Sequence, residues 1–108
     1  MKVAVIGSRG LTINVGEYVP EECEEIVSGG AQGIDRCAEI FAVERGLRLT
    51  VFLPDYQRYG RGAPIVRNKQ IVDYADLVLA FWDGKSKGTK SVIDYCKKSG
   101  KECRVIKL

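Results

Sequence analysis

Residues 25–46 read EIVSGGAQGIDRCAEIFAVERG, and the change of pattern inside this stretch indicates the fold class. A short strand is predicted at 25–28, with Ile26 and Val27 at its centre, and two glycines end it. Apolar residues then recur at helical spacing up to Gly46, which predicts a helix from about Ala31 to Arg45 with a left-handed glycine stop. A strand, a Gly-rich turn and a helix make up the unit from which parallel sheets are built.

The same alternation continues along the rest of the chain. Continuous apolar runs at residues 3–6 and 77–82 predict strands that are buried on both faces. The remaining predicted elements are strands at 47–53 and 103–106, a helical turn near 14–18, and helices at 64–74 and from about 90 to 99. We therefore expect one three-layer, Rossmann-like α/β domain over residues 1–108, with five parallel strands in the order 3-2-1-4-5.

The composition excludes several kinds of chemistry. The 108 residues include no histidine, so a Ser-His-Asp triad, a Cys-His pair and any His-containing metal site are excluded within one chain. The net charge of +3 is too mild to indicate nucleic-acid binding by itself. The sequence also offers no metal-ligand spacing, so we expect neither a metal nor a cofactor.

The four cysteines form no C-x-x-C pair, and Cys37 and Cys96 fall on apolar helix faces, where we expect them in the core. No apolar run is long enough to span a bilayer, and no signal peptide is evident at Met1. These features predict a cytoplasmic protein with reduced thiols and no membrane partner.

Ligands of such folds bind beyond the carboxyl ends of the strands, where the strand order reverses. With the predicted order, this crevice lies between the first and fourth strands. Polar, Gly-rich loops follow the first, second and fourth strands at that edge, and the helix beginning at Pro64 starts beside them. The candidate ligand-binding residues are Gly7, Ser8, Arg9, Ser28, Gly29, Gly30, Gly33, Asp35, Arg67, Asn68, Asp83, Gly84, Lys85, Ser86, Gly88 and Thr89.

These residue types suit a phosphorylated ligand. Glycines let the backbone approach closely, the free amides of a helix N-terminus favour an anion, and Arg9, Arg67 and Lys85 would neutralise its charge. The residues alone leave a second interpretation open at each loop. The glycines at 29–33 also suit a tight turn without a ligand. Gly88 and Thr89 also suit a loop that only caps a helix, and Asp35 also suits a helix start, where its charge interacts favourably with the helix dipole.

The motifs together resemble the SLOG superfamily, which includes DNA-processing protein A, the Lonely Guy cytokinin-activating enzymes and YpsA-like proteins. The likeness rests on residues 7–9, residues 26–35 (IVSGGAQGID) and residues 76–89, and it covers nearly the whole chain. Short stand-alone bacterial or phage members of the YpsA-like branch are the most similar. The resemblance implies a Rossmann-like fold, a nucleotide-type ligand at these loops and an Arg67-Asn68 pair typical of the nearer relatives. It also implies self-association, so we expect a homodimer.

One departure bears on catalysis. The Lonely Guy enzymes carry P-G-G-x-G-T-x-x-E, whose glutamate serves N-glycosidic cleavage, whereas Val92 stands three residues after Thr89 here. We therefore expect a binding or sensing module for a nucleotide or phosphorylated nucleoside derivative. Two alternatives remain: hydrolysis of an N-glycosidic bond by Asp35 or Asp83, and single-stranded nucleic-acid binding along residues 56–69, with Tyr56 and Tyr59 stacking on bases.

Overall fold

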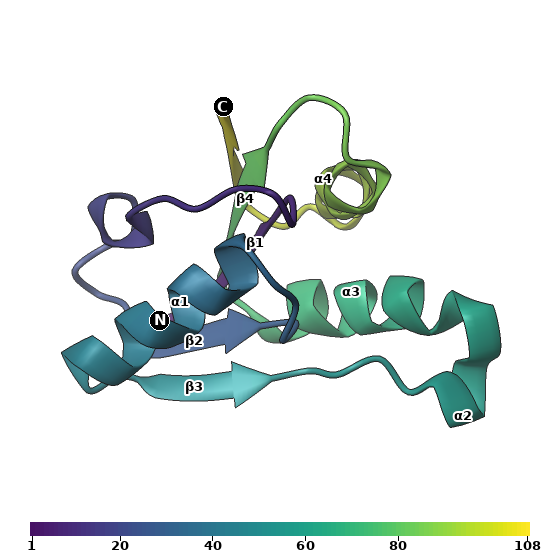
Figure 1. Cartoon of the computed structure of the whole chain (residues 1–108), viewed down its shortest axis with the longest axis horizontal. Coiled ribbons are helices and arrows are strands. Elements are labelled where there is room, and N and C mark those ends of the chain that lie inside the picture. Colours follow the sequence, from purple (N-terminus) through teal and green to yellow (C-terminus); the bar gives the residue numbers. More distant parts are fainter.

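The computed structural model describes all residues, 1–108, and places five parallel strands in one sheet with the order β3-β2-β1-β4-β5 (Figure 1). The elements are β1 (Lys2–Gly7), η1 (Val15–Glu17), β2 (Glu25–Ser28), α1 (Ile34–Arg45), β3 (Arg48–Val51), α2 (Tyr56–Tyr59), η2 (Gly60–Gly62), α3 (Ala63–Tyr74), β4 (Leu77–Trp82), α4 (Lys87–Ser99) and β5 (Cys103–Lys107). The predicted fold class and strand order are confirmed. None of the helices has the length and apolar character needed to cross a membrane.

The sheet separates two apolar cores because successive side chains of a strand point to opposite faces. On one face, Val3 and Val5 of β1 pack with the buried stripe Ile34, Ala38 and Ala42 of α1. On the other face, α3 and α4 cover the sheet with Ile71, Val72, Val92, Ile93 and Cys96. Both cores reach the middle strands β1 and β4, so the carboxyl ends of these strands are held rigidly.

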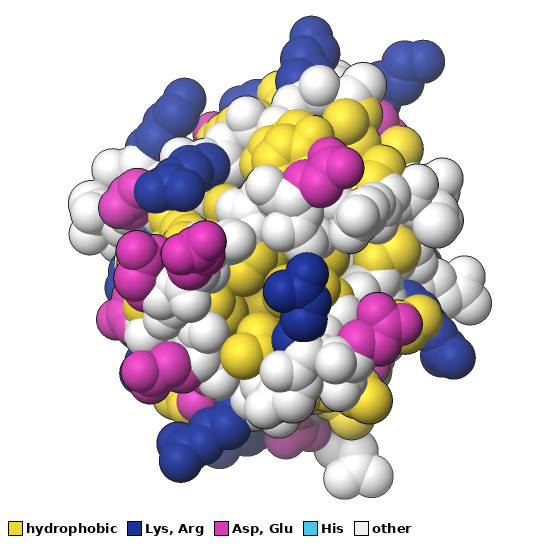
Figure 2. All heavy atoms as spheres, turned by 90° about the vertical axis from the view of Figure 1, so that its left-hand side faces the viewer, with side chains coloured by type: hydrophobic (Ala, Val, Ile, Leu, Met, Phe, Trp, Pro, Cys, Tyr) yellow, Lys and Arg dark blue, Asp and Glu magenta, His cyan; other side chains and the backbone are white.

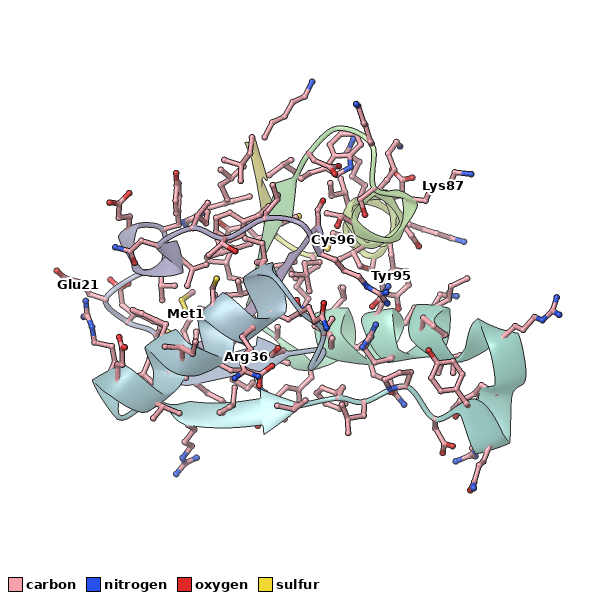
Figure 3. All side chains as sticks on the ribbon, viewed as in Figure 1. Met1, Glu21, Arg36, Lys87, Tyr95 and Cys96 are labelled. Carbon is pink, nitrogen blue, oxygen red and sulfur yellow. The ribbon has the colours of Figure 1, made fainter.

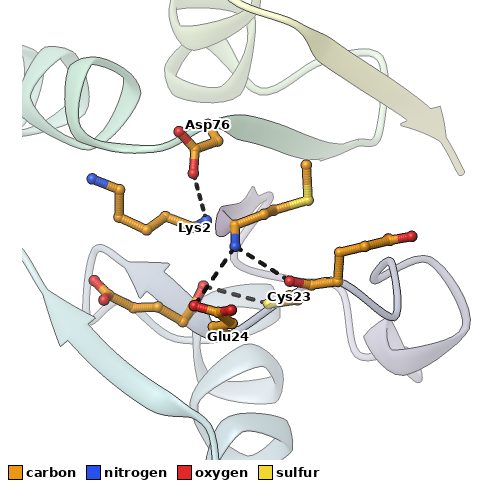
Figure 4. Close-up of polar contacts among 7 residues, drawn as sticks. Lys2, Cys23, Glu24 and Asp76 are labelled. Carbon is orange, nitrogen blue, oxygen red and sulfur yellow. Dashed lines mark hydrogen bonds and ion pairs between the residues drawn. The ribbon is translucent and has the colours of Figure 1, made fainter.

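Polar contacts fasten the amino ends of β1 and β4 (Figure 4). The backbone N–H of Lys2 donates to Asp76 Oδ2 at 2.7 Å, which holds the pKa of this carboxyl below its usual value. The Met1 ammonium donates to the Glu22 carbonyl oxygen at 3.3 Å and lies 4.0 Å from Glu24 Oε2. These contacts lie at the edge of the sheet opposite the predicted crevice.

Several predicted boundaries are wrong. Helix α1 begins at Ile34 instead of Ala31, because the chain at Gly33 has φ +72° and is not yet helical. Strand β3 ends at Val51, and α4 begins earlier than predicted, directly after the Ser86 cap. Residues 56–62 form the short helices α2 and η2, where only a loop was predicted. Cys96 lies in the core as predicted, but Cys37 is only partly buried at the flank of α1.

Figure 2 shows the side of the molecule from which β2 and β3 start. Acidic, basic and apolar side chains are interspersed over this side, and no single charge sign covers it. The glutamate-rich stretch at 17–25 therefore gives no broad acidic field on this side, in keeping with the mild net charge of +3.

Candidate functional site

A cleft of about 510 Å³ lies beyond the carboxyl ends of β1 and β4, where the strand order reverses. Its walls come from the loops after β1, β2 and β4 and from the first turns of α3 and α4. Of the predicted site residues, the structure brings together Gly7, Ser8, Arg9, Gly29, Asp35, Arg67, Asn68, Asp83, Ser86, Gly88 and Thr89. It leaves outside this cleft Ser28, Gly30, Gly33, Gly84 and Lys85.

The loop after β1 is packed tightly between its neighbours. The N–H of buried Ser8 donates to the carbonyl oxygen of Phe81 at 3.2 Å, and Ser8 Oγ accepts from the N–H of Asp83 at 3.4 Å. A Cβ on Gly33 would lie 2.3 Å from the carbonyl oxygen of Arg9, so the first two loops touch backbone to backbone. Gly33 thus serves the close approach of these loops instead of contacting a ligand directly.

Two amides of the loop after β2 are used internally, although the sequence predicted that the amides of this loop face a phosphate. The N–H of Gly30 donates to Ser28 Oγ at 3.2 Å, and the N–H of Ala31 donates to Asp35 Oδ2 at 3.2 Å. The carboxylate of Asp35 therefore takes up an amide that was expected to bind an external anion.

Asp35 is a buried carboxyl group, with 6% of its surface exposed, that lines the cleft. Burial raises its pKa from 3.8 to about 6 because the surroundings disfavour the charged form. The N–H of Ala31 and the positive charge of Arg67 offset part of this effect, whereas the negative charge of Glu39 adds to it. Asp35 therefore changes protonation near pH 6 at the wall of the cleft.

Arg67 of α3 is fixed beside Asp35. Its Nη1 donates to the carbonyl oxygen of Gly29 at 2.7 Å, and its Nε donates to Asn68 Oδ1 at 2.9 Å. A Cβ on Gly29 would lie only 2.8 Å from Arg67 Nη1, so a side chain at this position would displace the guanidinium. Its remaining nitrogen, Nη2, donates to no group of the chain, and Arg67 lines the cleft.

The loop after β4 is organised by Asp83. Its Oδ1 accepts the N–H groups of Lys85 and Ser86, both at 2.8 Å, which lowers the pKa of this carboxyl below its usual value. Ser86 then caps α4 by accepting from the N–H of Thr89. The loop turns Lys85 away from the cleft into a second hollow beside Trp82. Figure 3 shows Lys87, at the start of α4, extending outward from the molecule.

Backbone amides remain unused at opposite walls of the cleft. The N–H groups of Arg9 and Gly10, after β1, and of Gly88, in the first turn of α4, donate to no group of the chain. The side chain of Arg9 is exposed and forms no hydrogen bond or ion pair within the chain. These donors give the cleft a capacity for an anion that the protein itself does not fill.

The floor of the cleft is apolar, a feature that the sequence analysis missed. It consists of Ile6, Pro64, Ile71 and Val92. The spacing of apolar residues predicted the helix at 64–74, but spacing does not show that a buried helix face continues to the open end of a strand. Val92, three residues after Thr89, also lines this floor, with 3% of its surface exposed.

The tyrosines of the nucleic-acid alternative lie elsewhere. Tyr56 and Tyr59 belong to α2 and line no part of the cleft, and Arg58 lies over the Tyr59 ring at 5.4 Å. No family model, no curated protein and no solved structure matches this chain.

Proposed function

We propose that the chain binds a nucleotide or another phosphorylated nucleoside derivative in the cleft between β1 and β4. The observation that carries this proposal is the combination of unused donors with an apolar floor. The free amides of Gly10 and Gly88 suit phosphate oxygens, and Pro64, which is partly exposed beside the buried Ile71 and Val92, offers an apolar surface for a base or sugar ring. The resemblance to the SLOG superfamily in these loops supports the same ligand class.

The proposed ligand has a defined orientation. Its phosphate lies near Gly88 at the start of α4, where the helix dipole favours negative charge. Arg9 and the free Nη2 of Arg67 supply positive charge at the other wall. Asp35 accepts a hydrogen bond from a hydroxyl or amine of the ligand. A volume of about 510 Å³ accommodates a ligand of nucleotide size.

Thermal-shift and calorimetric titrations with nucleoside monophosphates, ADP-ribose and cyclic dinucleotides test this proposal, with unphosphorylated nucleosides as the comparison. Arg9→Gln should raise Kd roughly tenfold or more, since a charge-assisted contact contributes about 1.5–3 kcal/mol. Lys85→Gln is the matched control, because Lys85 is an exposed cation of the loop after β4 that lines the second hollow and not the cleft. No shift with any nucleotide, or equal weakening by both variants, contradicts the proposal.

A second candidate is hydrolysis of a nucleotide N-glycosidic bond with Asp35 as general acid or base. The favouring observation is a carboxyl that lines the cleft with a pKa of about 6, which suits proton transfer at neutral pH. Asp83 does not fit this role, because two backbone amides hold it as a carboxylate. Release of free base from nucleoside monophosphates, abolished in Asp35→Asn and retained in Lys85→Gln, supports hydrolysis. No release by the wild-type chain excludes it for the substrates tested.

A further inference from the structure

The open edge of β3 is an unprotected strand edge. The N–H of Arg48 donates to the Glu24 carbonyl oxygen, and that of Phe52 to the Ser28 carbonyl oxygen, so these residues face β2. Because backbone groups alternate along a strand, the N–H and C=O groups of Leu49, Val51 and Leu53 point to the other side. No strand pairs with β3 there, and Figure 1 shows β3 as the outermost strand of the sheet.

Apolar side chains accompany this open edge. Leu49, Val51 and Leu53 share one face of the strand, with Val51 38% and Leu53 67% exposed. On α1, which covers the same face, Val43 is 74% exposed and Ile40 is also exposed. Strands of parallel sheets are normally covered on both faces, so an outer strand with this much apolar surface indicates a missing neighbour.

The opposite edge of the sheet is built differently. Strand β5 carries Lys107 among its outward-facing positions and Arg104 next to them. Charged residues, lysine above all, are the usual protection of an edge strand against pairing with another chain. On β3 the only charged residue is Arg48, at its first position. One edge thus carries protection against pairing that the other lacks.

We propose that β3 pairs antiparallel with β3 of a second copy of this chain, about a two-fold axis beside Val51. In this register Val51 lies opposite its own copy, and Leu49 lies opposite Leu53 of the second copy. All the outward backbone groups of these residues then find partners, and every opposed side chain on that face is apolar. Arg48 lies opposite Pro54 of the second copy, so no two like charges face each other.

A second copy fits this edge better than an unrelated strand. The strand is complementary to itself in both backbone direction and side-chain character, as a two-fold interface requires. The exposed Val43 and Ile40 flank the same face and extend the apolar surface beyond the strand. The interface continues one sheet through both copies and leaves the cleft open, since none of Leu49, Val51 and Leu53 lines the cleft.

Sedimentation equilibrium of the full chain over a concentration series tests the pairing. The wild-type chain should approach twice its monomer mass of 12.0 kDa as concentration rises. Val51→Lys places two ammonium groups opposite each other at the axis and should weaken association about 100-fold. Val105→Lys makes the same substitution at an exposed residue of β5, the other edge strand. It is the matched control and should leave the dimer intact.

A Val51→Cys chain tests the register. Opposed residues of a hydrogen-bonded antiparallel pair have Cα atoms about 5.5 Å apart, a separation that a disulfide spans. A mild oxidant should link Val51→Cys chains into covalent dimers far faster than Val105→Cys or wild-type chains. A wild-type chain that stays monomeric up to roughly 1 mM overturns the proposal. So does a dimer that persists in Val51→Lys, or one that Val51→Cys fails to cross-link.

Discussion

Replacing Asp35 with asparagine should stabilise the fold at neutral pH. The carboxyl is buried at the start of α1, where Oδ2 accepts the N–H of Ala31 at 3.2 Å. An asparagine side-chain oxygen accepts the same bond and carries no charge, so the substitution preserves the contact and removes the cost of burying an anion. The space around Asp35 stays filled, because the two side chains are nearly isosteric.

The size of the stabilisation expected for Asp35→Asn follows from the pKa of Asp35. Burial raises the pKa of Asp35 from 3.8 to about 6, and a shift of roughly 2 units corresponds to about 3 kcal/mol. The raised value means that the unfolded chain ionises first as the pH rises. The free energy of unfolding therefore falls between about pH 4 and 6 and stays lower above that window. Below pH 4 Asp35 is protonated in both the folded and the unfolded chain, so the wild-type chain and Asp35→Asn should have similar free energies of unfolding.

Urea unfolding of both chains at several pH values between 4 and 7.5 measures this difference. All other titrating groups are shared, so they cancel when the two free energies of unfolding are subtracted. The free energy of unfolding of Asp35→Asn minus that of the wild-type chain should increase by about 3 kcal/mol from pH 4 to pH 7.5.

Asp76→Asn supplies a control of opposite sign. The backbone N–H of Lys2 lowers the pKa of Asp76, so this variant should lose stability at neutral pH. A constant difference between Asp35→Asn and wild type from pH 4 to 7.5 refutes the reasoning, because Asp35 then ionises equally well in the folded and unfolded chains.

Three further outcomes test the packing. Gly33→Ala should lower the free energy of unfolding by about 2–4 kcal/mol, because the φ of +72° disfavours a side chain and a backbone oxygen lies 2.3 Å from the new Cβ. Gly88→Ala is the control and should change this free energy by no more than about 1 kcal/mol. Chemical unfolding of the two variants measures the difference. Glu25→Gln should lower stability by about 1–3 kcal/mol near pH 7, since the Tyr74 hydroxyl donates to this carboxylate at 2.5 Å and holds its pKa below 4.5. That loss should disappear as the pH falls through the lowered pKa, and a loss that persists in acid argues against the pairing. The Cys96 thiol, buried in α4, should resist alkylation followed by mass spectrometry until the chain unfolds; rapid labelling of the native chain contradicts this burial.

The sheet could be predicted because burial dominates the sequence of its middle strands. Residues 77–82 are apolar throughout, and the structure makes them β4 with the predicted bounds. The strand order follows from the alternation of strands with helices, since right-handed crossovers leave few arrangements. The bounds of the edge strand β3 were predicted less accurately. Most of its residues are exposed, and its apolar pattern continues past Val51, the last residue that pairs with β2.

The orientation of loop side chains could not be predicted. Lys85 and Ser86 are neighbours, but only Ser86 lines the cleft, because their two amides converge on Asp83 and set the path of the loop. Likewise, the Gly-rich pattern after β2 predicted a close approach without indicating its partner. The structure identifies it as the backbone of Arg9 for Gly33 and the guanidinium of Arg67 for Gly29. These contacts join segments far apart in the sequence, and residue type alone carries no record of them.

The free-energy cost of burying the Asp35 carboxylate bears on whether the loop after β2 belongs to a ligand site or only joins β2 to α1. No buried side-chain nitrogen or oxygen of the chain lacks a hydrogen-bond partner, so the cleft is not strained by unpaired groups. Asp35 differs only in carrying a charge that burial opposes. A turn that merely joined β2 to α1 would be served as well by asparagine. A ligand that donates to Asp35 offsets the cost in the bound state alone, since hydrogen bonds to the charged form favour it. This concentration of cost beside Arg67 therefore favours a binding site over a structural turn.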